Sequence, residues 1–185
     1  MGIILASASP RRRELLSRIT DDFLCVPADI DEVVPDGIDA FAVPEYLARM
    51  KAAHVAAMYP SDVVIGSDTV VIADGDILGK PSDEDDARRM LRMLSGKVHT
   101  VVTGCAVVCG GRAESFSERT EVEFYTLTDA EIDRYVATGE PLDKAGAYGI
   151  QGKGCLLVRG IVGDYYNVMG LPVGRLYRMI SAFGG

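Results

Sequence analysis

Apolar positions recur along the chain with two different periods, one typical of strands and one typical of helices. Short apolar runs predict strands over residues 3–7, 23–26, 63–73, 99–109, 117–125, 155–162 and 165–169. Apolar residues spaced three or four apart predict a helix that begins at Pro10 and others over 44–58, 82–95, 128–138 and 172–183. Because strands and helices are interspersed from end to end, the sequence predicts an α/β fold with a mixed sheet.

Polar residues mark where several of these helices begin and end. Ser9 is expected to cap the first helix, and Ser82 is expected to cap the helix over 82–95, which Gly96 ends. Thr128 and Glu131 have the spacing of a capping box, in which each side chain satisfies a backbone N–H of the other. The caps therefore support the helices that the apolar spacing predicts.

The 185 residues contain no internal repeat or low-complexity tract, which predicts a single domain over 1–185. No Pro- or Ser-rich break separates two halves of the chain. Two lobes packed about a cleft are the alternative arrangement, with residues from about 80 to 140 forming part of the second lobe.

The balance of charged residues restricts the kinds of ligand that the protein is expected to bind. The chain has 19 basic and 27 acidic residues, a net charge of −8. Such a protein is not expected to bind a nucleic-acid polymer or an anionic membrane, because both need a broad positive surface. A small anion in a local basic pocket remains compatible with this balance. No apolar run reaches the roughly 18 residues of a membrane span.

The cysteine and histidine residues are few and scattered. The four cysteines form no C-x-x-C pair, so we expect buried free thiols, which suit a reducing cytosol. The two histidines, His54 and His99, are too few for a zinc site. The N-terminal charges follow the apolar stretch rather than precede it, which is the wrong order for a secretory signal. A cytoplasmic protein is the expectation.

The first segment with candidate chemistry is the turn from the first strand into the first helix. Ser7, Ser9, Arg11 and Arg12 lie there, beside free backbone N–H groups at a helix start. Arginine forks suit phosphate oxygens. The alternative is a capped helix with solvated arginines, and neighbours about 100° apart on a helix cannot all face one site. We favour anion binding.

Carboxylates supply a second candidate site. Asp68 interrupts an apolar strand, where it can ligate a hard cation or act as a general base on water. The alternative is an aspartate bonded to backbone at a strand kink. Glu32, with Asp29 and Asp31, lies in an acidic loop that offers oxygen ligands for Mg²⁺ or Mn²⁺, or is simply solvated.

Three further polar residues are ambiguous by themselves. Lys80 lies between Gly79 and Pro81 and suits either a phosphate contact or a solvated turn. Lys51 lies on the helix over 44–58. Gln151 lies in the Gly-rich loop over 145–154, where its amide is able to read a base edge, and a plain turn is the alternative.

Six motifs occur in a fixed order over almost the whole chain. They are Ser7-Ala-Ser-Pro-Arg-Arg, Gly66-Ser-Asp-Thr, Leu78-Gly-Lys-Pro, Ser95-Gly-Lys-x-His99, Asp143-Lys-Ala-Gly-Ala-Tyr-Gly-Ile-Gln and Gly170-Leu-Pro. Each is weak alone, but as an ordered set they resemble the Maf family of nucleotide pyrophosphatases. The resemblance implies an elongated, two-lobed α/β structure with a central cleft, similar to the inosine-triphosphate pyrophosphatases.

The resemblance also implies an activity. It is the hydrolysis of a nucleoside triphosphate to the monophosphate and pyrophosphate, assisted by Mg²⁺ or Mn²⁺, in a cytoplasmic homodimer. Asp68 matches the proposed proton acceptor, and Glu32, Lys51 and Lys80 match further polar site residues. Glu32 and Asp68 are the expected metal ligands, and Ser7, Ser9, Arg11 and Arg12 the expected phosphate contacts. Asp68 cannot be both a tight ligand and a free base, and the sequence leaves both roles open.

Three positions separate branches of the family, and here they are Arg11, Thr69 and Gln151. This set resembles the dTTP/UTP branch rather than the 7-methyl-GTP branch, with modified pyrimidine nucleotides as further candidate substrates. Two other functions stay open at this point. A non-catalytic nucleotide-binding regulator of septum formation or cell division would bind nucleotide without turnover, and a generic phosphatase would release orthophosphate.

Overall fold

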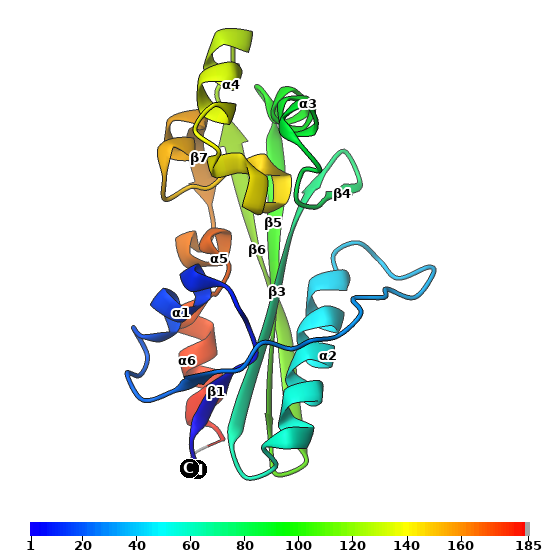
Figure 1. Cartoon of the computed structure of the whole chain (residues 1–185), viewed down its shortest axis with the longest axis vertical. Coiled ribbons are helices and arrows are strands. Elements are labelled where there is room, and N and C mark those ends of the chain that lie inside the picture. Colours follow the sequence, from blue (N-terminus) through cyan, green and yellow to red (C-terminus); the bar gives the residue numbers. More distant parts are fainter. Residues whose placement is uncertain (184–185) are drawn as a thin grey trace. The chain divides into compact units, whose positions relative to one another are not determined.

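The structure is a computed structural model that describes residues 1–183 (Figure 1). The strands are β1 (Ile3–Leu5), β2 (Leu24–Cys25), β3 (Val63–Ala73), β4 (Asp76–Leu78), β5 (Val98–Cys109), β6 (Arg112–Phe124) and β7 (Val158–Val162). The α-helices are α1 (Pro10–Leu16), α2 (Val43–Met58), α3 (Glu84–Leu94), α4 (Asp129–Val136), α5 (Tyr165–Met169) and α6 (Val173–Ser181). Three short 3₁₀ helices are η1 (Glu140–Asp143), η2 (Ala145–Ala147) and η3 (Lys153–Leu157).

The strands form one seven-stranded sheet of order β2-β1-β3-β5-β6-β7, with β4 paired to β3. β1 pairs in parallel with both β2 and β3, so that Leu5 lies opposite Cys25 on one side and Ile65 on the other. β4 and β7 pair antiparallel with β3 and β6. The sheet is therefore mixed, and the predicted α/β fold is confirmed.

Two predicted strands differ from the structure. Residues 165–169 form helix α5, because the Asp164 carboxylate accepts a hydrogen bond from the Tyr166 N–H (2.8 Å) and satisfies a free donor of the first turn. β6 begins at Arg112 rather than at 117. Gly110 and Gly111 both have positive φ, at 57° and 83°, as in a two-residue hairpin turn that passes directly into the next strand.

Smaller differences lie at element ends. The cap of α3 is Asp83, whose Oδ1 accepts from the Asp86 N–H (2.8 Å). The prediction of Ser82 is therefore wrong by one residue, since the Ser82 N–H instead donates to the Asp86 carboxylate (3.0 Å). Ser9 caps α1, and the capping box at the start of α4 is present, as predicted. Residues 155–157 belong to η3 rather than to β7.

The chain forms two compact units. Unit 1 comprises Met1–Thr69, Thr103–Glu118 and residues 170–183. Unit 2 comprises Val70–Val102 and Arg119–Met169. Strands β3, β5 and β6 contribute residues to both units. The second lobe expected over about 80–140 stays a prediction, and residues 103–118 of that range belong to unit 1.

Unit 1 is built on close packing of α2 against strands β3 and β5. Gly66 and Gly104 lie where these strands meet the helix backbone. A Cβ at Gly66 would lie under 3.0 Å from backbone atoms of Ala48 and Ala52, and one at Gly104 would meet the backbone of Pro44 in the same way. A strand approaches a helix this closely only where the side chain is missing. Small residues on the helix, among them Ala48 and Ala52, complete the contact.

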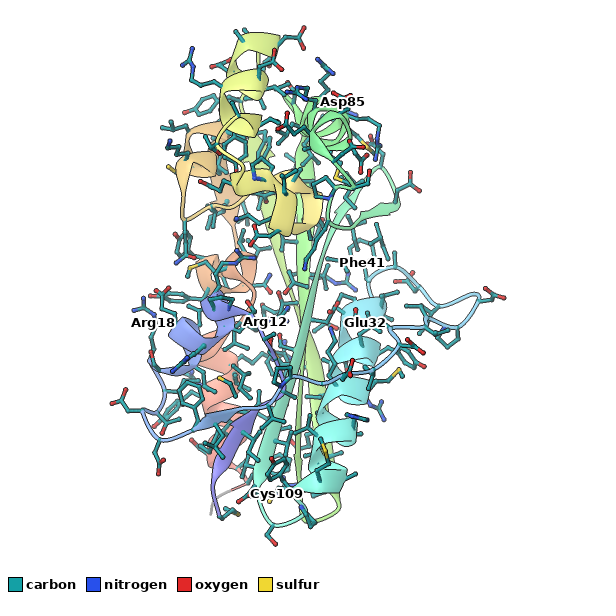
Figure 2. All side chains as sticks on the ribbon, in the orientation of Figure 1. Arg12, Arg18, Glu32, Phe41, Asp85 and Cys109 are labelled. Atoms are coloured by element: carbon teal, nitrogen blue, oxygen red, sulfur yellow. The ribbon has the colours of Figure 1, made fainter. Side chains whose placement is uncertain are left out.

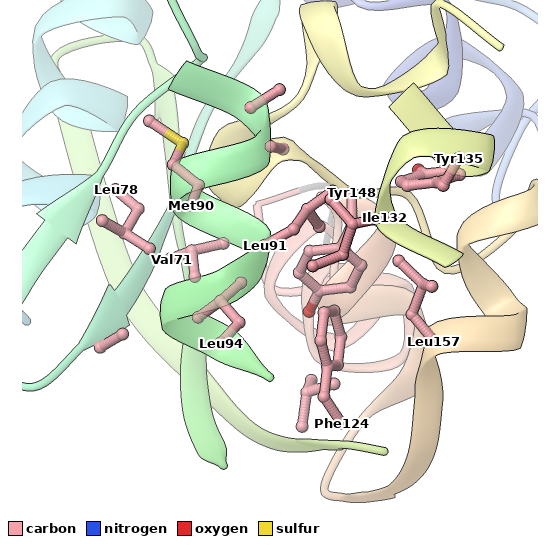
Figure 3. Packing of buried hydrophobic residues seen from close by; sticks show 14 of the residues in the cluster. Val71, Leu78, Met90, Leu91, Leu94, Phe124, Ile132, Tyr135, Tyr148 and Leu157 are labelled. Atoms are coloured by element: carbon pink, nitrogen blue, oxygen red, sulfur yellow. The ribbon is translucent and has the colours of Figure 1, made fainter. Parts of the chain in front are cut away.

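Unit 2 has its own apolar core beneath α3 and α4 (Figure 3). Leu91, Leu94 and Ile132 are fully buried in it. Phe124, Tyr148 and His99 add a group of edge-on rings, with centroids between 4.7 and 5.3 Å apart. Packing against this apolar core, rather than helix propensity alone, stabilises the short helices α3 and α4 on the sheet.

The cysteines are free, as predicted, but only Cys105 is buried. Cys25 and Cys155 are exposed, because the first lies in the two-residue strand β2 and the second in the turn η3. The prediction of buried thiols is therefore wrong for these two, and Cys109 is only partly buried. No helix within residues 1–183 has the length and apolarity that crossing a bilayer requires.

Candidate active site

Lys51 and Asp68 form a buried ion pair in unit 1. Lys51 lies on α2 and Asp68 on β3, and the Lys51 Nζ donates to the Asp68 Oδ1 at 2.6 Å. The Lys51 Nζ also lies 2.8 Å from the Glu32 Oε1, although the Glu32 side chain is half exposed. One ammonium thus joins two carboxylates. The absence of a side chain at Gly66 brings α2 near enough to β3 for this contact.

Burial raises the pKa of the Asp68 carboxyl above its ordinary value. The positive charges of Lys51 and Arg12 act in the opposite direction, and the negative charge of Glu32 reinforces the rise. Asp68 is therefore a stronger base than an exposed carboxylate, and it is held in one place by the ammonium.

Arg12 forms the second part of the site (Figure 2). Its Nε donates to the Gly170 carbonyl (3.0 Å), and its other nitrogens donate to the Thr69 hydroxyl (3.0 Å) and to the Ser7 hydroxyl (3.5 Å). Burial lowers the pKa of this guanidinium, and the charge of Asp68 opposes that shift. Residues 158 positions apart in the sequence are thereby joined beside the buried carboxylate.

The start of α1 fixes the direction of Arg12. The Ser9 Oγ accepts from the Arg12 N–H (3.4 Å), and the Ser7 Oγ accepts from the Ser9 N–H (3.2 Å). Arg12 is directed inward, whereas Arg13 is exposed and Arg11 is partly buried. This arrangement agrees with the expectation that three adjacent arginines do not face one site.

Sequence reasoning missed two polar residues of this network. The Thr103 hydroxyl lies 2.9 Å from the Thr69 hydroxyl, and the Ser67 hydroxyl donates to the Gly170 carbonyl (3.2 Å). Both residues are fully buried in strands. The available signal was a hydroxyl in an otherwise apolar run at Thr103, the same kind of interruption that drew attention to Asp68.

Lys80 and Gln151 belong to unit 2, and both are exposed. The segments that carry them are joined within that unit, since the Gly146 N–H donates to the Gly79 carbonyl (3.0 Å). Gly146 has a positive φ of 66° and packs against Val71, where any side chain would collide. Two of the six sequence motifs thus meet in the fold.

The loop of Gln151 has an anchor that sequence reasoning did not find. The Glu140 carboxylate accepts hydrogen bonds from the Lys153 N–H (2.9 Å), the Gly154 N–H (3.3 Å) and the Tyr135 hydroxyl (3.0 Å). The Gly149 N–H donates in turn to the Tyr135 oxygen (3.0 Å). The Gly-rich loop is therefore not a plain turn but a segment closed on a carboxylate.

A divalent cation fits part of this arrangement. No three Asp, Glu, His or Cys side chains within residues 1–183 gather closely enough to hold a metal ion on their own. Glu32 and Asp68 nevertheless converge on the single ammonium of Lys51, so their oxygens lie near one point. Mg²⁺ is commonly held by one or two carboxylates together with substrate phosphates, which suits a site of this kind.

Comparison with known sequences gives a consistent result. The family described as Maf-like protein matches residues 2–183. A dTTP/UTP pyrophosphatase of Koribacter versatilis is 53% identical over 185 residues, which is 100% of this chain and 95% of that protein. A protein of the same name from Bacillus cereus is 49% identical over 98% of this chain and 95% of its own length.

Two solved structures share the fold. The Staphylococcus aureus Ham1 protein aligns with a TM-score of 0.57 at 17% identity, covering 97% of this chain and 98% of that one. A HAM1 protein from Coxiella burnetii aligns over the same shares with a TM-score of 0.54 and 14% identity. At this identity the likeness concerns the fold alone.

Proposed function

Because the chain belongs to the Maf family, we propose that it hydrolyses dTTP and UTP to the nucleoside monophosphate and pyrophosphate. The structural observation that carries the proposal is the buried Asp68 carboxylate, held at 2.6 Å by Lys51. A carboxylate with a raised pKa and a fixed position is suited to take a proton from water. A solvated aspartate would lack both properties, and one bonded to backbone N–H groups would lack the raised pKa.

Each of the polar residues of unit 1 has its own role in the proposed reaction. Asp68 accepts the proton of a water molecule whose oxygen attacks the α-phosphorus. The bond from that phosphorus to the bridging oxygen breaks, and pyrophosphate leaves with that oxygen. Lys51 orients Asp68 throughout. Arg11 and Arg12, with the hydroxyls of Ser7 and Ser9, bind phosphate oxygens and stabilise the charge on the leaving group.

Glu32 would hold the divalent cation, Mg²⁺ or Mn²⁺. Asp68 would join it as a ligand only in place of acting as the base, because a carboxylate bound tightly to a cation does not take a proton. When bound, the cation neutralises phosphate charge and polarises the phosphorus. Lys51 then has a second task, because it keeps two carboxylates close together that would otherwise repel each other. Lys80, exposed in unit 2, is proposed as a further phosphate contact.

Pyrimidine selectivity is proposed to depend on Arg11, Thr69 and Gln151. The free edge of uracil or thymine presents two carbonyl oxygens and one N–H, and an amide such as that of Gln151 offers the complementary donor and acceptor. A buried polar group left unpaired by a wrong base discriminates strongly against that base. The family resemblance is also our reason to propose a cytoplasmic homodimer, and modified pyrimidine triphosphates as further substrates.

The deciding experiment measures pyrophosphate release from dTTP, UTP, CTP, GTP and 7-methyl-GTP, each with Mg²⁺, Mn²⁺ or EDTA. We expect metal-dependent release from dTTP and UTP. Release from 7-methyl-GTP instead would keep the reaction and overturn the selectivity. Orthophosphate as the product would indicate a generic phosphatase. Tight nucleotide binding without any release would favour the non-catalytic regulator.

A further inference from the structure

Glu140 lies at the centre of the loop that carries Gln151. Its Oε2 accepts from the Lys153 N–H at 2.9 Å, and its Oε1 accepts from the Gly154 N–H at 3.3 Å and from the Tyr135 hydroxyl at 3.0 Å. The two backbone donors follow Gln151 by two and three residues. One side chain therefore fixes the backbone on the C-terminal side of Gln151.

The N-terminal side of the loop is fixed through Tyr135. Its oxygen accepts from the Gly149 N–H at 3.0 Å and donates to Glu140. Lys144 adds a third tie, because its Nζ donates to the Glu140 carbonyl at 2.7 Å. Backbone on both sides of Gln151 is thus bonded, directly or through one hydroxyl, to the same residue.

The glycines of the loop are shaped around this carboxylate. A Cβ at Gly152 would collide with both Glu140 carboxylate oxygens, and one at Gly154 would lie 2.7 Å from the Tyr135 hydroxyl. A Cβ at Gly149 would lie 2.6 Å from the Lys144 side chain, which would have to shift. The Gly-rich composition is therefore explained by the Glu140 anchor as well as by any ligand.

The charge state of Glu140 suits an anchor. Burial raises its pKa, but the hydrogen bonds from the Lys153 and Gly154 N–H groups and from Tyr135 outweigh burial, and the pKa is lowered overall. The carboxylate is thus ionised at neutral pH, and charge-assisted hydrogen bonds are about twice as strong as neutral ones. Its bonds are directed to the loop itself, which distinguishes Glu140 from a residue that binds substrate.

We infer that Glu140 is a positioning residue for base selection: it holds the loop over 149–154 so that Gln151 reads the pyrimidine base. The inference rests on the proposed function, in which Gln151 contacts the base. Glu140 itself touches no reacting atom and acts through the backbone of the loop. Losing it should therefore change which base is accepted rather than how fast the phosphate bond breaks.

The variant that tests this is Glu140→Gln, which keeps the size of the side chain and places an NH₂ group where one carboxylate oxygen accepted. The matched control is Glu131→Gln on α4. Glu131 is also in unit 2 and also accepts a backbone N–H, from Thr128 at 2.8 Å, but in the capping box rather than in the loop. Both variants lose one negative charge, and only one of them releases the loop.

The measurement is kcat/KM for UTP, CTP and methyl triphosphate, which carries the phosphate chain and no base. For Glu140→Gln we expect the ratio of UTP to CTP to fall about tenfold, the effect of losing one hydrogen bond to a charged group. The loss should lie mainly in KM for UTP. Hydrolysis of methyl triphosphate should not change, and Glu131→Gln should match the wild type in all three.

Two results would overturn the inference. One is an unchanged ratio of UTP to CTP in Glu140→Gln. The other is an equal fall for UTP and methyl triphosphate, which would indicate general damage to the fold. A double variant sharpens the test: Glu140→Gln should lower the ratio little further in a Gln151→Ala background, because both changes remove the same base contact. If the two substitutions instead lowered the ratio of UTP to CTP by the product of their separate effects, Glu140 would not act through Gln151.

Amide hydrogen exchange tests whether Glu140 holds the loop, independently of enzyme activity. In Glu140→Gln the amides of Lys153 and Gly154 should exchange at least about tenfold faster, since each loses a charged acceptor. Unchanged exchange would remove the structural basis of the inference. A failure of the proposed function looks different, because the wild type itself would then release no pyrophosphate.

Discussion

The Lys51 ammonium lies 2.6 Å from the Asp68 carboxylate, and each of these residues is only 9% exposed. A buried pair of this kind is weak evidence for a role in stability, since apolar residues of similar size often pack as well. Its presence at the junction of α2 and β3 is better explained by chemistry, because it keeps a buried carboxylate ionised and fixed. Glu32, bonded to the same ammonium at 2.8 Å, adds a second charge at one point.

Asp68→Asn tests the proposed base. The amide oxygen of asparagine still accepts from Lys51, so the fold should be retained, but the side chain no longer takes a proton. We expect kcat for dTTP to fall by about 10²–10⁴-fold in a protein that still folds, because the Lys51 ammonium keeps Glu32 as a charged partner. Turnover at the wild-type rate would exclude Asp68 as the base.

Glu32→Gln is the partner experiment. If Glu32 serves mainly as a metal ligand, excess Mg²⁺ or Mn²⁺ should restore much of the activity that this variant loses.

Lys51→Met removes the ammonium and keeps the length of the side chain. Asp68 is then buried without its partner, which costs about 3–5 kcal/mol when one member of a buried ion pair is lost. Unfolding by urea should show this loss, and it should shrink in Lys51→Met with Asp68→Asn, where no buried charge is left unpaired. Equal stability of the single and double variants would show that the pair is more solvated than its burial indicates.

Thr69→Val removes the hydroxyl that joins Arg12 to Thr103. The Arg12 guanidinium loses one of its acceptors and the Thr103 hydroxyl loses its neighbour, so we expect a loss of about 1–3 kcal/mol in unfolding free energy. Thr69→Ser is the matched control, since it keeps the hydroxyl. A Thr69→Ser protein as unstable as Thr69→Val would indicate that the methyl group matters rather than the hydrogen bonds.

Protonation of His99 should make stability depend on pH. Burial lowers the pKa of His99 to about 4 from an ordinary value of 6.5, so below pH 6.5 the unfolded chain binds a proton that the folded chain does not. Stability should therefore rise between pH 4 and 6.5, by about 3 kcal/mol over the whole window, and be lost as the pH falls through it. The measurement is urea unfolding at several pH values.

His54 provides the control for this experiment. It is the second of the two histidines and is exposed on α2, so His54→Gln should keep the pH dependence of the wild type. His99→Phe, combined with Tyr148→Phe so that no hydroxyl loses its partner, should remove most of the dependence on pH in this window. A pH dependence that survives in the double variant would assign it to other groups.

Two glycine-to-alanine substitutions should have opposite effects on the stability of the protein. A Cβ at Gly104 would meet the backbone of Pro44 and Glu45, which cannot move without shifting α2, so Gly104→Ala should destabilise the protein by about 3 kcal/mol or more. Gly174 lies on an exposed face of α6, where Gly174→Ala should stabilise by about 0.5–1 kcal/mol. Comparison of the two Tm values is sufficient, and a tolerated Gly104→Ala would show that α2 is not pressed against β5.

Long, strongly patterned elements were predictable from the sequence. β3 was predicted with its observed bounds, and α2 within one residue, because each contains more than ten residues of a single pattern. Residues 165–169 were not predictable in this way. Five residues rich in aromatic and apolar side chains suit a strand or a helix equally. The hydrogen bond that the Asp164 carboxylate accepts from the Tyr166 N–H favours the helix.

The site was predictable in part for a similar reason. Asp68 stood out because a carboxylate interrupted an apolar strand. Ser9, followed by Pro10, indicated the start of α1. Lys51 was ambiguous as one lysine on a helix, because its meaning arises from the close approach of α2 to Gly66 in the folded chain. Glu140 gave no local signal for the loop contact, since its two partners in the loop are backbone groups that follow it by 13 and 14 residues.

The path of the chain through the two units restricts how this protein can be divided. The backbone passes from one unit to the other four times, and three of these passages lie inside β3, β5 and β6. No single cut yields either unit as one continuous fragment. Neither unit can therefore be exchanged with another gene or expressed alone by simple truncation. A recombination event with a single crossover cannot transfer either unit whole, so the two units are expected to be inherited together.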